Sequence, residues 1–448
     1  MKLQVKNKGN QTMQWESLSD FDQSRIKRWQ WGMLALALLC EMFLAADWYA
    51  FAAVIPFISE TLQLDSAQAG LAQGIFALTY GLGMIVWSQL SRRMNARSLL
   101  LIGLFCTAIG MVAQVYVQTY AQLIALRLFI GFFDAAIFLG NMKLIIGWFP
   151  QKRRGSMIGL ILAAYSLAIT LDFAIGIPLS ITYGWRTFFA ILAIGTLVTA
   201  AGVLLFTRNN PAHIGFKDFR WEPEKQQTST ASLSSIFRSK WIIVGSLGIS
   251  ACTMAIAGTA TWVIPGYIAV HQMPVEDAAL IGTLMGLSQV VFLVIGGYAA
   301  DRLNKTGMIK FGTVLAVLVA AMFTLGMAVP LGFGWLILMA LLSGVALFGG
   351  GAIFAFLSEK YPEELATAAV GYAEIFAILA TFISPWVMGV VIKVSGGSFV
   401  SAFLTFAIME AIILAIILVV TRESFSLNDD KVAIAASGNG ISGEASRS

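Results

Sequence analysis

Twelve runs of apolar residues, most of them about 20 residues long or longer, take up most of this 448-residue chain. Hydrophobic residues make up 58% of the sequence and charged residues only 12%. A helix of about 20 apolar residues crosses the hydrocarbon of a bilayer, where every backbone group must be bonded inside its own helix. The sequence therefore predicts an all-α membrane protein with twelve transmembrane helices. Their predicted ranges are 31–57, 67–90, 98–118, 120–148, 155–182, 186–207, 241–270, 276–300, 308–330, 333–358, 364–392 and 398–421.

The lysines and arginines gather in alternate connections between these spans. If the N-terminus is cytoplasmic, 25 of the 29 basic residues lie in cytoplasmic segments. Cytoplasmic loops carry this kind of excess, so we expect both termini inside the cell. The formal charge of +5 then reflects membrane topology and does not indicate nucleic-acid binding. The first 30 residues lack the apolar core of a removable signal peptide, and the first span is expected to direct insertion.

One long polar segment, residues 209–239, divides the spans into six and six. It contains Pro211, Pro223 and a run of Gln and Thr, so we expect a linker between two bundles. The predicted organisation is a cytoplasmic tail (1–30), a six-helix bundle (31–208), the linker (209–239), a second bundle (240–421) and a tail (422–448). The Gly- and Ser-rich end of that tail cannot bury an apolar face and is expected to be disordered.

A short basic loop occurs at matching places in the two halves. The second copy is Gly297–Lys305 and the first is Trp87–Asn95, and aligning them places Asp301 opposite Ser91, 210 positions apart. Such a repeat is typical of transporters built from two related bundles. Because the acid is missing from the first copy, we expect the copy with Asp301 to contribute more to closing the cytoplasmic side. The predicted inner-gate residues are Arg92, Asp301 and Arg302.

The six-plus-six arrangement and the doubled loop resemble the major facilitator superfamily. The resemblance extends from Trp31 to Arg422 and includes Arg127–Gly131, which is similar to the family's Arg-x-x-x-Gly element. Two further segments, Gly147–Gly155 and Gly184–Phe189, look like the branch of this family that carries organic and inorganic anions, the anion:cation symporter-like branch.

This resemblance implies the major facilitator fold, in which the first, fourth, seventh and tenth spans line a cavity. The second, fifth, eighth and eleventh spans of that fold form the contacts between the halves. It also implies a multi-pass protein of the bacterial cytoplasmic (inner) membrane that works as a monomer and transports a small-molecule substrate.

Ionisable side chains inside spans cost a few kcal/mol unless they face protein or water, so each is a candidate functional residue. Those selected for substrate binding or proton coupling are Glu41, Asp47, Arg127, Asp134, Asp172 and Glu374. By the resemblance, Asp47 and Asp134 belong to the cavity, whereas Asp172 and Glu374 belong to the contacts between the halves. We expect Arg127 to reach across to Asp47, either as part of a proton switch or as a permanent structural counter-ion.

Three ionisable residues have other expected positions, and the first of them, Glu41, belongs to the selected set. Glu41 lies on another face of its helix from Asp47 but could still reach a neighbouring helix. Lys143 lies near the inner end of its span and is expected to extend to the membrane surface. Glu410 falls in a span that the resemblance places on the periphery, and it is not selected.

Neutral polar and aromatic side chains could orient a ligand in the cavity. The selected residues are Tyr49, Asn141, Trp262, Tyr267, Gln289 and Tyr372. Trp262 and Tyr267 lie toward a span end, where such residues more often anchor a helix at the membrane surface. The run Gly349–Gly351 either lets its helix bend or lets a second helix approach closely, and the sequence does not distinguish the two.

Several function classes lack the residues they would need. No Gly-Lys dipeptide occurs, which excludes a Walker A loop, and the two histidines form no metalloprotease pair. We therefore expect neither an enzyme nor a bound cofactor or metal. The favoured function is a secondary active transporter that works by alternating access, with proton-coupled uptake of a small polar solute such as an organic anion.

Two other functions stay open. A proton-driven exporter of cationic or lipophilic compounds would suit a cavity in which acids outnumber Arg127. The fifth span reads Gly176-Ile177-Pro178, however, where exporters of this family typically have adjacent Gly and Pro. A channel or a transporter-like receptor is the third hypothesis, which saturable and pH-dependent flux would contradict.

Overall fold

The computed structural model of the chain describes residues 15, 18–217, 219, 221, 233–300, 302–361 and 363–422. Within this part of the chain, twelve helices are long and apolar enough to cross a membrane. The predicted all-α membrane fold with twelve spans is therefore confirmed. Asp301, residues 218, 220 and 222–232 of the predicted linker, and residues 423–448 of the predicted C-terminal tail lie outside the described residues.

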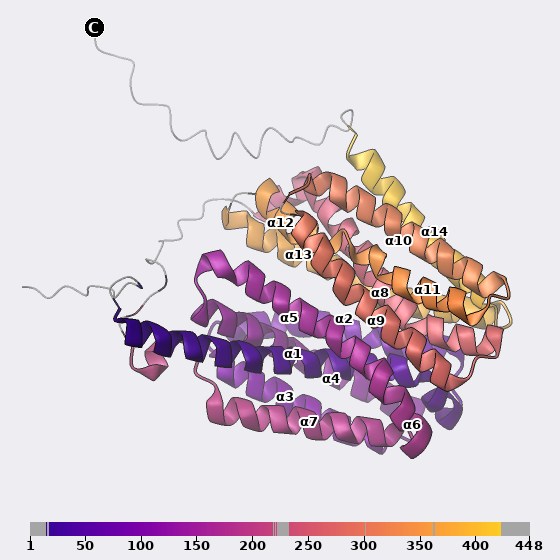
Figure 1. The fold of residues 1–448 in the computed structure, drawn as a ribbon, viewed down its shortest axis with the longest axis horizontal. Coiled ribbons are helices and arrows are strands. Elements are labelled where there is room, and N and C mark those ends of the chain that lie inside the picture. The colour runs from indigo at the N-terminus through magenta and orange to yellow at the C-terminus, as the bar shows by residue number, and fades with distance from the viewer. Residues whose placement is uncertain are drawn as a thin grey trace, which may run out of the picture. The chain divides into compact units, whose positions relative to one another are not determined.

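The chain forms two compact units (Figure 1). The first unit takes in residues up to Leu64 and Ile75–Gln226, and the second takes in Asp65–Gly74 and the residues from Gln227 onward. The early helices are α1 (Asp20–Leu62), α2 (Ser66–Ser91), α3 (Ala96–Val115), α4 (Tyr120–Trp148), α5 (Gln151–Leu171), α6 (Ile177–Tyr183) and α7 (Trp185–Phe206). The later helices are α8 (Lys240–His271), α9 (Val275–Ala300), α10 (Lys305–Ala328), α11 (Phe333–Ser343), α12 (Gly350–Lys360), α13 (Glu363–Val394) and α14 (Phe399–Val420).

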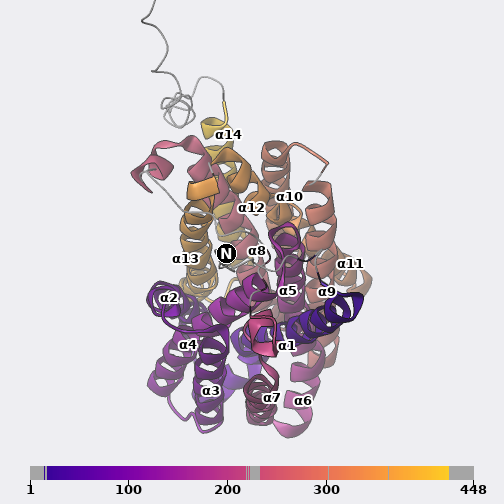
Figure 2. The ribbon, with the colours of Figure 1, turned by 90° about the vertical axis from the view of Figure 1, so that its left-hand side faces the viewer.

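Corresponding helices pack together in the two units. In the first unit, α1 packs against α4 and α5, and α3 packs against α4 and α7, as Figures 1 and 2 show. In the second unit, α8 packs against α13 and α12, and α10 packs against α12 and α14. The internal repeat seen in the sequence is thus also a repeat of helix pairing.

The first helix of each unit carries the same two irregularities, 209 residues apart. Pro56 lies inside α1 and Pro265 inside α8. Each helix ends at a glutamine in the left-handed conformation, with φ of 54° at Gln63 and 50° at Gln272. Proline inside a membrane helix is tolerated where neighbouring groups bond the freed backbone.

Helix caps set the register of the doubled loop. The end of α2 and the end of α9 are 209 residues apart, as are the starts of α3 and α10. Asn95 and Asn304 cap the latter two helices, each through its side-chain oxygen and the backbone amide three residues on, at 2.9 and 3.2 Å. By this register Asp301 corresponds to Arg92, so its alignment with Ser91 was wrong by one residue. The two copies differ by a reversed charge at this position.

Two predicted spans are interrupted, and one helix is longer than predicted. A π-helical turn (Asp172–Gly176) separates α5 from α6, and a 3₁₀ turn (Gly344–Leu347) lies between α11 and α12. The first helix begins at Asp20, well before the predicted residue 31, because the Ser19 hydroxyl accepts a hydrogen bond from the Asp22 amide at 3.2 Å. Hydropathy locates only the apolar part of a helix, whereas capping decides where the helix starts.

The glycines at the start of α12 permit both a bend and a close approach of helices. Gly349 follows the 3₁₀ turn, and a Cβ atom there would lie 3.1 Å from the Gly312 Cα atom of α10. A Cβ atom at Gly351 would lie 2.6 Å from the Gly297 Cα atom of α9. By contrast, a Cβ atom at Gly350 meets only side-chain atoms, at 3.6 Å. A bend of the helix and a close approach of neighbouring helices, the two hypotheses for this segment, therefore both apply to this run of glycines.

We predict that Gly351→Ala destabilises the protein, whereas Gly350→Ala does not. The new methyl group at position 351 would press on the backbone of Gly297, which costs about 1–3 kcal/mol in a well-packed site. Alanine at position 350 meets no backbone and gains helix propensity of up to about 1 kcal/mol. Thermal unfolding in detergent, followed through exposure of the buried cysteines, measures the difference. Equal melting temperatures for the two variants would contradict the packing argument.

Candidate functional site

Arg127 of α4 lies fully buried in the first unit and is bound by the backbone of α1. Its Nη1 and Nη2 atoms donate hydrogen bonds to the carbonyl oxygens of Asp47 at 3.2 Å and Trp48 at 3.1 Å. Its guanidinium also lies over the rings of Phe51 at 5.1 Å and Phe76 at 4.6 Å. A helical carbonyl has a second lone pair beyond its own helix bond, so α1 can accept these donors without unwinding.

The side chain of Asp47 is fully buried next to this arginine. Neither carboxyl oxygen has a hydrogen-bond partner within the described part of the chain. The charge of Arg127 attracts this carboxyl group, and the carboxyl groups of Asp134 and Asp172 repel it. Arg127 does reach residue 47, as predicted, but it donates to the backbone carbonyl oxygen there and not to the carboxyl group.

Asp134 lies on α4 and is bonded from α3. The Thr107 hydroxyl donates to its Oδ1 atom at 2.5 Å, and its Oδ2 atom has no partner among the described residues. Sequence analysis missed Thr107, because a threonine in an apolar span carries no charge and most such hydroxyls bond their own helix. The bond places one oriented donor on a buried carboxyl group.

Asp172 opens the π-helical turn between α5 and α6. The side chain is 2% exposed, and its Oδ2 atom is without a hydrogen-bond partner in the described ranges. Turns of this kind occur most often at functional sites, because the extra backbone residue redirects a side chain. Sequence reasoning selected Asp172 from its charge alone and did not predict the turn that presents it.

Glu41 bonds to a neighbouring helix, as its position on α1 suggested. The Asn141 side-chain amide of α4 donates to its Oε2 atom at 3.0 Å, and both residues are buried. Arg127, Asp134 and Asn141 are spaced by seven residues, about two helical turns, and so form one polar stripe along α4 over about 21 Å. This stripe faces the two acids of α1.

Aromatic side chains border the charged cluster. The Trp48 ring centroid lies 4.7 Å from that of Phe76 and 5.0 Å from that of Tyr80. The Tyr49 ring lies 5.9 Å from the Tyr165 ring in an edge-on arrangement. Tyr49 therefore lies beside the cluster, next to Trp48 and Tyr165.

Among the described residues, the candidates of the second unit make separate contacts and form no corresponding cluster. Trp262 donates to the Pro385 carbonyl oxygen at 2.8 Å, and the Tyr267 hydroxyl lies 3.7 Å from the Met339 sulfur. Both side chains are buried, so they do not anchor the helix at a membrane surface. Gln289 is buried, and its Oε1 atom is unpartnered in the described chain.

Tyr372 and Glu374 lie on α13 and are half-buried. The Tyr372 ring packs 4.5 Å from the Phe237 ring. Glu410 of α14, which sequence analysis set aside, is fully buried, and neither of its carboxyl oxygens has a partner among the described residues. The sequence did contain a signal for Glu410, because an acid in the middle of the most apolar span is costly. Glu410 was not selected because the resemblance places this span on the periphery.

The two loop copies are bound to α4 in the first unit and to α12 in the second unit, by different side chains. Lys143 of α4 donates to the carbonyl oxygens of Ser91 at 2.5 Å and Met94 at 2.6 Å, instead of extending to the membrane surface. In the second unit, Lys305 forms an ion pair with Glu359 of α12 at 2.5 Å.

Among the predicted gate residues, the Arg302 guanidinium stacks over the Tyr298 ring at 4.1 Å, and Arg92 is exposed. The side chain of Asp301 is not described.

The two segments that indicated the anion-carrying branch connect helix ends. The Trp148 indole donates to the Arg208 carbonyl oxygen at 2.6 Å, and the Trp148 carbonyl oxygen accepts from the Gln30 side chain at 2.7 Å. The Trp185 indole donates to the Thr61 hydroxyl at 3.0 Å. Arg186 donates to the carbonyl oxygens at the end of α3, at 3.0 and 2.9 Å. These residues stabilise the first unit and do not contact the charged cluster.

The acids of the site are not arranged for a metal ion. Within the described ranges, no three His, Cys, Asp or Glu side chains come together in a way that could hold one. The arrangement instead offers one permanent cation and several carboxyl groups that can exchange protons or repel an anion.

Comparison with known proteins decides the family. Residues 37–377 match the Major Facilitator Superfamily, which is more than half of the chain. The chain belongs to the major facilitator superfamily. It is therefore an integral, multi-pass membrane transporter, and its family consists of transporters and not of enzymes.

Three relatives show which kinds of transporter this superfamily member is similar to. A probable L-galactonate transporter of Escherichia coli K12 is 23% identical over 67% of this chain and 68% of its own length. A probable galactarate/D-glucarate transporter of Bacillus subtilis 168 is 21% identical over 82% of this chain and 86% of its own. A quinolone resistance transporter of Acinetobacter baumannii is 24% identical over 74% of this chain and 80% of its own.

A solved structure shares the fold of this superfamily member. The bacterial homologue of the human lysosomal transporter Spinster superposes with a TM-score of 0.69, covering 91% of this chain and 98% of its own, at 16% sequence identity. At this identity the similarity concerns the fold alone.

We predict that Thr107→Val destabilises this transporter, because it removes the one bond that an uncharged side chain gives to Asp134. The valine is nearly isosteric, so the loss reflects the hydrogen bond to a buried acid, about 1–3 kcal/mol. Thr196→Val is the matched control, since Thr196 is equally buried and bonds only the Leu192 carbonyl oxygen of its own helix. Thermal unfolding in detergent compares the two. If Thr196→Val lowered the melting temperature more than Thr107→Val does, the bond to Asp134 would contribute no more to stability than an ordinary threonine bond within a helix.

Proposed function

We propose that this transporter carries a small organic anion into the cell together with protons, by alternating access of its two units. One observation carries the proposal: a single buried arginine lies among four buried carboxyl groups, and the carboxyl oxygens of Asp47 lack partners in the described residues. The names of two relatives, an L-galactonate and a galactarate/D-glucarate transporter, support a sugar acid as the substrate.

The charges of the cluster support proton coupling. Four ionised carboxyl groups around Arg127 would leave a net negative charge inside an apolar bundle, which is costly. We infer that surplus carboxyl groups hold protons when the site is empty of substrate. A substrate carboxylate would then compete for Arg127 and would be repelled by any acid that lost its proton. Anion binding and proton binding would favour each other.

We assign each residue of the site a role in transport. Arg127 would bind the substrate carboxylate, since a planar guanidinium matches the geometry of a carboxylate and keeps its charge in a protein. Asp47 would carry the transported proton, and Asp134 and Asp172 would set its affinity. The hydroxyl and amide groups of Tyr49 and Asn141 would orient the sugar hydroxyls. We further propose that the protein works as a monomer in a bacterial cytoplasmic membrane, with both termini inside.

We predict that Asp47→Asn abolishes uptake of D-glucarate driven by a pH gradient in proteoliposomes. Asparagine keeps the size of the side chain but cannot take up a transported proton, so accumulation against a gradient should fall more than tenfold. Glu60→Gln, at an exposed position of the same helix, should transport normally. Counterflow without a proton gradient is the second readout, and Asp47→Asn should retain part of it. Full accumulation by Asp47→Asn would overturn proton coupling through this residue.

A proton-driven exporter of cationic or lipophilic compounds is the second candidate function. The excess of acids over Arg127 favours it, as does the similarity to a quinolone resistance transporter.

We predict that sugar acids such as D-glucarate and L-galactonate raise the melting temperature of the purified transporter and that quinolones and quaternary ammonium compounds do not. A ligand that binds only the folded state stabilises it by RT ln(1 + [L]/Kd), so the shift in melting temperature should grow with ligand concentration. Arg127→Lys is the matched variant, because it keeps the charge but loses the paired donors. It should reduce the shift produced by sugar acids. Stabilisation by cations alone would replace the uptake proposal with the exporter.

A further inference from the structure

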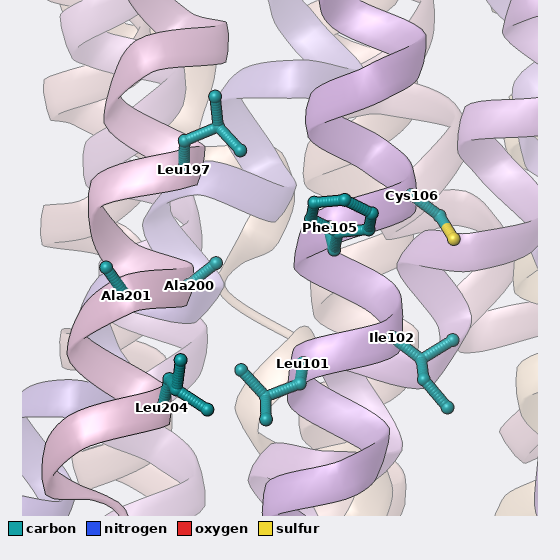
Figure 3. Close-up of a pocket in the computed structure, with 8 residues that line it drawn as sticks. All are labelled: Leu101, Ile102, Phe105, Cys106, Leu197, Ala200, Ala201 and Leu204. Carbon is teal, nitrogen blue, oxygen red and sulfur yellow. The ribbon is translucent and has the colours of Figure 1, made fainter.

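A hollow lies on the surface of the first unit, between α3 and α7 and away from the charged cluster. It has a volume of about 400 Å³, and its lining contains only apolar side chains and one thiol (Figure 3). The small side chains of Ala200 and Ala201 lie between Leu197 and Leu204 on α7 and leave this space. The residues on α3 are Leu101, Ile102, Phe105 and Cys106.

The hollow is open to the membrane. Phe105 is 56% exposed and Leu204 is 50% exposed, although both are large apolar residues in spans. Such exposure on a membrane helix marks a surface that faces hydrocarbon. An apolar groove of this kind would hold a hydrocarbon chain.

A polar pocket adjoins the apolar groove. Its volume is about 460 Å³, and Leu204 lines both spaces. Its other lining residues are Asn95, Arg97, Leu205, Thr207, Arg208, Asn209 and His213, which include two arginines and no acid. The two spaces together have a cationic end and an apolar end.

The structure positions both arginines at the rim of this pocket. The backbone amide of Arg97 donates to the Asn209 side-chain oxygen at 2.9 Å, and its guanidinium donates to the Leu204 carbonyl oxygen. The Arg97 Nε atom is buried and has no partner among the described residues, so the terminal nitrogens of this guanidinium would contact an anion. Arg208 donates from Nη1 to the Thr207 carbonyl oxygen at 3.0 Å. A guanidinium has five donors, so both side chains keep N–H groups for an anion.

The dimensions match one leaflet of a bilayer. Arg97 lies in the first turn of α3, and Cys106 lies nine residues further, about 13 Å along the helix axis. On α7 the distance from its last residue, Phe206, back to Leu197 is about 14 Å by the same rise. Half of the hydrocarbon core is about 15 Å thick. The groove therefore runs from the level of the headgroups to near the middle of the membrane.

We propose that the groove and the pocket form a binding site for one anionic phospholipid. Its phosphate binds between Arg97 and Arg208, and one acyl chain lies in the groove against Ala200 and Ala201. The positive-inside rule places this end of the first unit in the cytoplasmic leaflet, where anionic lipids attract basic residues. The bound lipid covers exposed apolar surface of α3 and α7 and lies next to the loop that ends at Asn95. This site is independent of the proposed substrate site.

Native mass spectrometry of the purified full chain, titrated with phosphatidylglycerol or phosphatidylcholine, tests the proposal. The wild type should bind one phosphatidylglycerol molecule more tightly than phosphatidylcholine. Arg97→Ala and Arg208→Ala should each weaken phosphatidylglycerol binding about fivefold, the weight of one basic residue near a lipid surface. Arg93→Ala, an exposed arginine of the same loop outside the pocket, should bind as the wild type does.

Two further variants keep the test independent of folding. Arg97→Lys with Arg208→Lys keeps both charges and should retain the preference for the anionic lipid. Ala201→Trp fills the groove without changing charge and should weaken phosphatidylglycerol binding about tenfold while leaving the melting temperature of the delipidated protein unchanged. Equal binding of the two lipids would overturn the proposal. So would wild-type binding of phosphatidylglycerol by Ala201→Trp or by a variant that combines Arg97→Ala with Arg208→Ala.

Discussion

The two hydrogen bonds from Arg127 to the backbone of α1 constrain the arrangement of the whole first unit. A guanidinium keeps its charge in a protein, so inside an apolar bundle it must find acceptors. Here backbone oxygens provide them, and these oxygens neither move away nor take up protons. The carboxyl group of Asp47 is attracted electrostatically but has no hydrogen-bond partner among the described residues. The site thus holds a fixed cation beside acids whose protonation is still variable.

Around this cluster the unit is stabilised mainly at the helix ends. Trp148 and Arg186 bond to carbonyl groups at the ends of neighbouring helices, where no intrahelical donor is left to pair with them. Lys143 does the same for the loop after α2. Such contacts lie outside the polar stripe of α4, so the segments that resemble the anion-carrying branch describe a scaffold. The substrate itself has to be inferred from the buried charges and from relatives.

Apolar length and the segregation of charge made the fold predictable, because lipid allows few alternatives to a helix. The polar stripe of α4 was also predictable, since Arg127, Asp134 and Asn141 recur every seven residues. Residue type alone could not predict Thr107, which looks like any threonine that bonds its own helix. Nor could it set the loop register, which depends on capping by Asn304.

The repeat separates what the fold requires from what the site requires. Positions 209 residues apart share prolines, left-handed glutamines and asparagine caps, all of which shape the backbone. The same register places Leu336, Ser343 and Gly350 opposite the three residues of the α4 stripe. The second unit therefore has the same backbone features but no charged side chain at these three positions. Its corresponding helix is interrupted by a 3₁₀ turn that begins one residue after the position of Asp134. Since a buried charge is costly wherever it has no role, its presence in one copy alone argues that the stripe serves transport and not folding.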